Sequence, residues 1–211
     1  TLGLFALEEK DQDSNPGDKK RMKTSGDDSV LLNSQSRSFE YTRINSVEGK
    51  VNQLLEIDGT LFASGASGVF EVSGQNAKSV IHEGVRNVFL SPTMNQVLVS
   101  TLNNQIKTFI PEKNGWHETH LLDTLRNHFS YVFEDNLENV WLCGSSFIYK
   151  VEIVDGQVIG IIKYPIQNPT EDETLGLALG SEVYVVSSGQ FKHFNGSGFE
   201  KYDSLSGGHR Y

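Results

Sequence analysis

The sequence predicts an all-β fold, a β-propeller of four-stranded antiparallel blades, and two observations support this. First, four segments each contain a short β-branched or aromatic run, a turn of small residues and a second short run, which is typical of a β-hairpin. These segments are TLFASGASGVFEV (60–72), QVLVSTLNNQIKTF (96–109), NVWLCGSSFIYKV (139–151) and EVYVVSSGQFKHF (182–194). Their equivalent residues Leu61, Val97, Val140 and Val183 are 36, 43 and 43 positions apart. This spacing is close to the ~40–45 residues of a propeller blade. Second, 20 glycines against five prolines indicate many tight turns.

Each hairpin lies between two further apolar runs. The preceding runs are VNQLLEI (51–57), VRNVFLS (85–91), FSYVFED (129–135) and LGLALG (175–180). The following runs are SVIHE (79–83), WHETHLL (116–122), VIGIIKY (158–164) and GFEKY (198–202). Each unit therefore predicts one strand a, a hairpin of strands b and c, and one strand d.

The N-terminal region predicts half of an earlier blade. TLGLFAL (1–7) resembles a strand c and SFEYTRI (38–44) a strand d, with a polar insertion at 8–35 between them. The predicted boundaries are 1–44 for the half blade, then 45–83, 84–122, 123–164 and 165–203 for four blades, and 204–211 for the next connection. We therefore expect about four and a half blades of a larger ring, completed by further blades of a parent chain.

Composition excludes several classes of function. The 211 residues have a formal net charge of −9, which argues against nucleic acid as a partner because phosphate binding needs a basic surface. No run approaches 18 apolar residues, so we expect no membrane segment within the chain. A single cysteine, Cys143, excludes a disulfide framework and a cysteine-rich zinc site.

The segment EDNLENVWLCGSSFIYKV (134–151) contains the sharpest motif, through Asp135, Asn139 and Trp141. EIDGTLFASGASGVFEV (56–72) shares it through Asp58, Gly59 and Phe62. We expect structural roles for these six residues, because the turn needs positive φ and the aromatic side chain fills the gap between splayed blades. Both segments resemble the repeat of the two-component regulator propellers. They depart from it at Glu138 and Thr60, which replace turn residues, and at Cys143, which replaces a glycine.

This resemblance implies a function. It implies a periplasmic ligand-sensing domain of a two-component sensor histidine kinase, homodimeric in the parent protein, that responds to a carbohydrate or other small molecule. Any kinase activity would lie outside this chain, so the chain itself is expected to be a binding domain and not an enzyme. The alternative is a propeller scaffold that binds proteins and has no small-molecule ligand.

Loops that converge on one face of a propeller offer candidate ligand-binding residues. These are Arg86, Asn87, Asn103, Asn104, Arg126, Asn127, His128, His209 and Arg210. The Arg-Asn pairs at 86–87 and 126–127 suggest a repeated ligand-facing position; alternatively, each arginine binds carbonyls of a neighbouring blade.

The sequence indicates no catalytic residues, no metal ligands and no cofactor. HETH (117–120) would place its two histidines on opposite faces of a strand. Cys143 lies in an apolar strand, which predicts a buried and inert thiol. The acidic run TEDET (170–174) is the only dense carboxylate cluster, and a propeller enzyme would have to use it.

Overall fold

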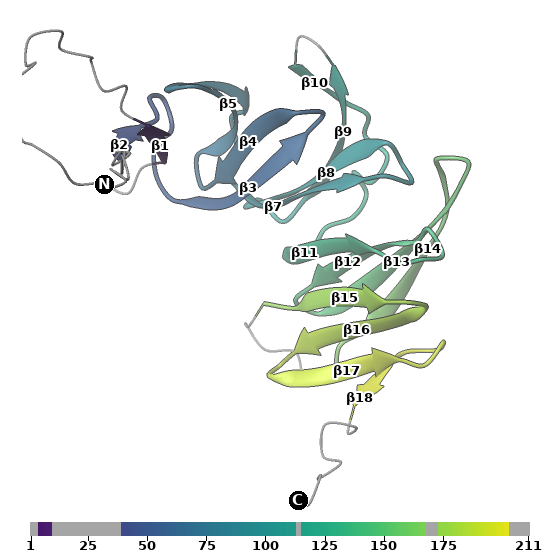
Figure 1. The fold of residues 1–211 in the computed structure, drawn as a ribbon. Coiled ribbons are helices and arrows are strands. Elements are labelled where there is room, and N and C mark those ends of the chain that lie inside the picture. The colour runs from purple at the N-terminus through teal and green to yellow at the C-terminus, as the bar shows by residue number, and fades with distance from the viewer. Residues whose placement is uncertain (1–3, 10–38, 113–114, 168–172, 203–211) are drawn as a thin grey trace, which may run out of the picture.

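The computed structural model describes residues 4–9, 39–112, 115–167 and 173–202. Within these ranges every regular element is a β-strand, as the sequence predicts. No helix in this part of the chain is long and apolar enough to cross a membrane. Figure 1 shows four sheets that follow one another along an open arc, with a two-stranded sheet before them. Residues 10–35 of the predicted insertion and the predicted connection 204–211 lie outside the described residues.

The strands group into one pair and four sheets, each sheet formed by consecutive strands. The pair is β1 (Phe5–Glu9) and β2 (Phe39–Arg43). Blade 1 is β3 (Val51–Ile57), β4 (Thr60–Gly65), β5 (Gly68–Ser73) and β6 (Asn76–Ile81). Blade 2 is β7 (Val85–Ser91), β8 (Gln96–Thr101), β9 (Ile106–Glu112) and β10 (Gly115–Glu118). Blade 3 is β11 (Phe129–Glu134), β12 (Val140–Gly144), β13 (Phe147–Val154) and β14 (Gln157–Pro165). Blade 4 is β15 (Leu175–Leu179), β16 (Glu182–Ser187), β17 (Gln190–Phe194) and β18 (Phe199–Lys201).

Every blade is a meander in which each strand pairs antiparallel with the next. The first strands, β3, β7, β11 and β15, contact one another in succession and form the inner side of the arc. In β3, β7 and β11 the pairing with the second strand shifts by one residue after Val51, Val85 and Phe129. This repeated β-bulge bends the start of each innermost strand and changes the direction of its side chains.

The tight turns follow the predicted chemistry. Asp58 and Gly59 join β3 to β4 with φ values of 49° and 76°, the two left-handed conformations that a type I′ hairpin turn requires. Glu138 also adopts a left-handed conformation, with φ of 65°. A glutamate therefore holds a backbone conformation that glycine adopts more readily.

Adjacent blades enclose the hydrophobic core. One residue near the start of each strand b has its side chain in the layer shared with the following blade: Phe62 between blades 1 and 2, Leu98 between blades 2 and 3, and Trp141 between blades 3 and 4. Phe62 and Trp141 are 5% and 1% exposed. This confirms that the aromatic side chains of the motif fill the space between splayed blades.

Side-chain hydrogen bonds tie each blade to the next. The Gln53 amide donates to the carbonyl of Val88 at 2.7 Å and accepts from its N–H at 2.9 Å. The Ser130 hydroxyl donates to the carbonyl of Thr174 at 2.6 Å and accepts from its N–H at 3.1 Å. Because one side chain satisfies both the N–H and the C=O of one residue, each of these pairs of bonds fixes the register between neighbouring innermost strands.

The far face of blade 4 is apolar and open. Leu175, Leu177 and Leu179 are 45%, 38% and 62% exposed, and Val186 on the adjacent strand is 38% exposed. Tyr184 lies among them at the position that Trp141 occupies in blade 3. In blades 1 to 3 this face packs against the following blade.

Candidate functional site

A cleft of about 750 Å³ opens where the innermost strands of all four blades begin. We call it the channel cleft. It is lined by the first residues of β3, β7, β11 and β15, by side chains just before them, and by Leu102 just after β8. The residues are Lys50, Val51, Asn52, Gln53, Arg86, Asn87, Leu102, His128, Ser130, Tyr131, Glu173 and Leu175. Such a volume suits a small molecule or a few residues of a peptide.

Three of the sequence candidates lie in this cleft, namely Arg86, Asn87 and His128. The Arg86 guanidinium donates to the carbonyls of Thr101 and, at 3.3 Å, of Leu102. Both carbonyls belong to the end of strand b of the same blade, so Arg86 binds its own blade and not a neighbouring one. The Asn87 Oδ1 atom is buried and has no hydrogen-bond partner among the described residues.

The two Arg-Asn pairs do not occupy equivalent positions. Arg86 is the bulged second residue of β7, whereas Arg126 precedes β11 by three residues. Arg126 donates to the carbonyls of Asp123 and, at 3.0 Å, of Leu125 in its own turn. Asn127 accepts from the His128 N–H at 2.8 Å. The expectation that the two Arg-Asn pairs share one repeated position is therefore wrong. The bulge in β7 and the different loop lengths place the pairs at different points relative to their innermost strands.

Asn103 and Asn104 lie in the turn between β8 and β9 and do not line the cleft. The Asn103 amide donates to Glu83 at 3.4 Å, and Asn104 has a left-handed φ of 60°. The remaining candidates, His209 and Arg210, lie outside the described residues.

The charges of the channel cleft are mixed. Lys50 and Arg86 contribute cations, and Glu173 from the TEDET run contributes a carboxylate. Burial lowers the pKa of His128, the nearby Arg86 lowers it further, and Glu173 acts in the opposite direction. Burial also lowers the pKa of Arg86, with Glu173 again opposing. At neutral pH the cleft thus presents a neutral imidazole between a guanidinium and a carboxylate.

Sequence reasoning did not select several lining residues, among them Lys50, Asn52, Gln53 and Ser130. They lie at or next to the starts of innermost strands, which were judged only by their apolar pattern. The interblade ties of Gln53 and Ser130 reach residues 35 and 44 positions away, so no local motif could indicate them.

Of the two aspartates expected to have structural roles, one makes several hydrogen bonds and the other makes none among the described residues. The Asp135 carboxylate accepts from the Leu137 N–H at 2.9 Å, the Asn139 N–H and side-chain amide at 3.0 Å, and the Trp141 indole N–H at 2.7 Å. It therefore organises the whole turn into strand b of blade 3. Asp58, at the corresponding turn of blade 1, makes no hydrogen bond or ion pair within the described part of the chain.

Two sites weighed for chemistry have structural explanations. Cys143 is fully buried, as predicted, and burial raises the pKa of its thiol. In the HETH segment, His120 Nδ1 lies 2.7 Å from Asp123 and 3.6 Å from Glu118. The three possible ligand atoms lie within 4.8 Å of one another. The His120–Asp123 hydrogen bond and the Lys107 ammonium, 3.8 Å from Glu118, account for this grouping without a metal.

Comparison with known proteins identifies the fold but no family. No family model matches the sequence, and no curated protein matches it. The solved structure described as "YCF48 bound to D1 peptide" is similar, with a TM-score of 0.52 and 12% sequence identity. The alignment covers 82% of this chain and 63% of that chain, so this chain spans less than two thirds of YCF48. YCF48 is a β-propeller protein, and the likeness shows that the four sheets described above are propeller blades.

Proposed function

We propose that this chain is a protein-binding propeller module whose channel cleft receives an extended peptide segment of a partner. The observation that carries the proposal is the cleft itself, which crosses the starts of four innermost strands. It offers amide side chains at Asn52 and Asn87, cations at Lys50 and Arg86, and a carboxylate at Glu173. A peptide backbone presents N–H and C=O groups at regular intervals, and such a mixture of donors and acceptors can satisfy both. That the structurally similar YCF48 was solved with a peptide supports the same class of partner.

The test is selection of random dodecapeptides against residues 1–211. Asn52 is exposed and lines the cleft, so Asn52→Arg places bulk and charge in the cleft without removing an interblade bond. Asn76→Arg makes the same change on the exposed start of outer strand β6 and serves as the matched control. We expect peptides that bind the wild type and Asn76→Arg but lose at least tenfold in affinity on Asn52→Arg. Peptides that bind all three equally, or no enriched peptide, would overturn the proposal.

The second candidate is the carbohydrate-responsive periplasmic domain of a two-component sensor histidine kinase. It is supported by the repeat motif around Asp135 and Trp141 and by Tyr131, an aromatic ring that lines the polar cleft and could stack on a sugar. An oligosaccharide at 100 times its Kd should stabilise the fold by about 2.7 kcal/mol. A thermal shift with a sugar, abolished by Asn52→Arg, together with no peptide selection, would favour this candidate over the first.

A further inference from the structure

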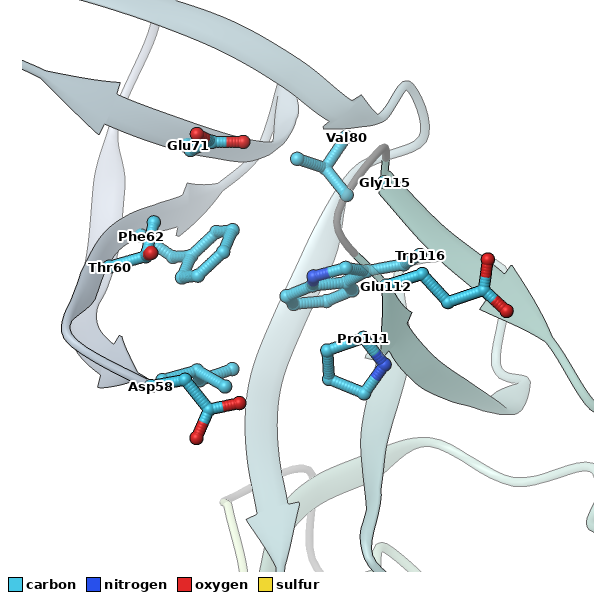
Figure 2. A pocket seen from close by; sticks show the side chains of 10 residues that line it. Asp58, Thr60, Phe62, Glu71, Val80, Pro111, Glu112, Gly115 and Trp116 are labelled. Carbon is cyan, nitrogen blue, oxygen red and sulfur yellow. The ribbon is translucent and has the colours of Figure 1, made fainter.

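A second, smaller cleft lies between blades 1 and 2, away from the channel cleft. We call it the outer cleft; its volume is about 330 Å³. Its apolar wall is formed by Phe62 of β4, Val80 of β6, and Pro111 and Trp116 of β9 and β10. The rings of Phe62 and Trp116 are 5.1 Å apart at 48°. Figure 2 shows the Phe62 ring directed toward the indole, with open space beside both rings.

Acidic side chains border these rings. Glu71 is the direct cross-strand partner of Phe62, so its side chain lies on the same face of blade 1. Asp58 lies in the turn below, on the Phe62 side of the cleft, whereas the carboxylate of Glu112 points away from it (Figure 2). Among the described residues, neither Asp58 nor Glu71 has a hydrogen-bond or ion-pair partner. No basic side chain of the described residues lines the cleft.

The equivalent place between blades 3 and 4 is filled by aromatic side chains, so the opening is not a feature of every pair of blades. There Trp141 replaces Phe62 and donates its indole N–H to Asp135, which begins the turn between strands a and b of blade 3. Tyr164, Phe194 and Phe199 pack around that indole at 5.0 to 6.0 Å. In the outer cleft the Trp116 indole N–H has no partner in the described part of the chain, so it remains a free donor.

We propose that the outer cleft binds an arginine side chain presented by a polypeptide. A guanidinium is the cation that both stacks on an indole and donates paired hydrogen bonds to carboxylates, and the outer cleft offers these two features together. The free indole N–H can donate to a backbone carbonyl next to that arginine. An ammonium lacks the flat face that stacking needs, and a quaternary ammonium cannot donate to Asp58 or Glu71.

This binding does not depend on the channel cleft, because the two clefts share no residue. Lys78 is the cross-strand neighbour of Glu71 on β6 and makes no ion pair within the described ranges. Its ammonium would compete with an incoming guanidinium for Glu71. Removing that charge should therefore strengthen binding.

The chain has two tryptophans, so a ¹H–¹⁵N spectrum of residues 1–211 has two indole signals, assigned with Trp116→Phe. The probe is acetyl-Gly-Arg-Gly-amide, compared with its citrulline and lysine versions and with tetramethylammonium. We expect the arginine peptide to shift the Trp116 signal saturably while that of the buried Trp141 stays in place. The citrulline peptide should bind at least tenfold more weakly, and the lysine peptide and tetramethylammonium at least threefold.

Variants test the carboxylates. Glu71→Gln and Asp58→Asn should each weaken the arginine peptide at least threefold, and Lys78→Gln should tighten it about twofold. Glu56→Gln is the matched control, because Glu56 pairs with Leu61 and so lies on the opposite face of blade 1. Equal binding of arginine and citrulline, equal binding of arginine and lysine, or an equal loss in Glu56→Gln and Glu71→Gln would overturn the proposal. Asn52→Arg should leave this binding unchanged, which separates it from the channel cleft.

Discussion

The Asp135 carboxylate is predicted to hold blade 3 together, and Asp135→Asn tests this. One oxygen of the new amide can still accept from the Leu137 and Asn139 N–H groups. The other position becomes an NH₂ group that faces the Trp141 indole N–H, formerly 2.7 Å from Oδ2. Trp141 is 1% exposed, so water cannot replace the lost acceptor. A charge-assisted bond of about 1.5–3 kcal/mol and the cost of an unpaired buried donor together give a loss of about 2–4 kcal/mol.

Urea unfolding followed by circular dichroism measures this loss. At a urea m value of about 2–3 kcal/mol/M, the midpoint should fall by roughly 1 M. Asp58→Asn is the matched control and should cost less than about 0.5 kcal/mol, because Asp58 has no partner among the described residues and asparagine suits its turn. In a Trp141→Phe background the Asp135→Asn cost should shrink by about 1–2 kcal/mol. Equal costs for Asp135→Asn and Asp58→Asn, or no coupling to Trp141, would refute the reasoning.

Three further changes follow from the same structure. Glu138→Gly should stabilise the fold by about 0.5–1 kcal/mol in urea unfolding, because glycine adopts the left-handed φ of 65° without strain. Gln53→Ala should lower the unfolding free energy by about 1–3 kcal/mol, since both peptide groups of the buried Val88 lose their partner; Asn52→Ala, one residue away, should not. Because the pKa of His128 is lowered in the folded state, the unfolded chain binds more protons just below pH 6.5, so stability falls there as the pH falls. Thermal unfolding between pH 7.5 and 5.5 should show a smaller fall for His128→Asn.

The blades could be predicted because each blade is formed by one continuous stretch of the sequence. Its four strands are consecutive, its turns are short, and residues such as Asp58 and Gly59 have a conformational preference that acts within the turn itself. The hydrophobic layers were predictable for the same reason. The residue after the aligned apolar position of strand b, such as Leu98 after Val97 or Trp141 after Val140, lies in a layer between blades wherever the meander repeats.

The candidate sites could not be predicted in this way, because they form between blades from residues far apart in the sequence. Asp58 and Asp135 both lie in the turn between strands a and b of their blades, and sequence reasoning gave both a structural role. Asp135 begins a turn of residues 135–139, so its carboxylate accepts from N–H groups of that turn as well as from the buried indole of Trp141, which Phe194 and Phe199 cover. Asp58 faces Phe62, which has no polar atom to donate, so its carboxylate stays free. The two-residue turn and the phenyl ring of blade 1 together leave the Asp58 carboxylate available to a ligand, and this depends on turn geometry and on the packing of the next blade.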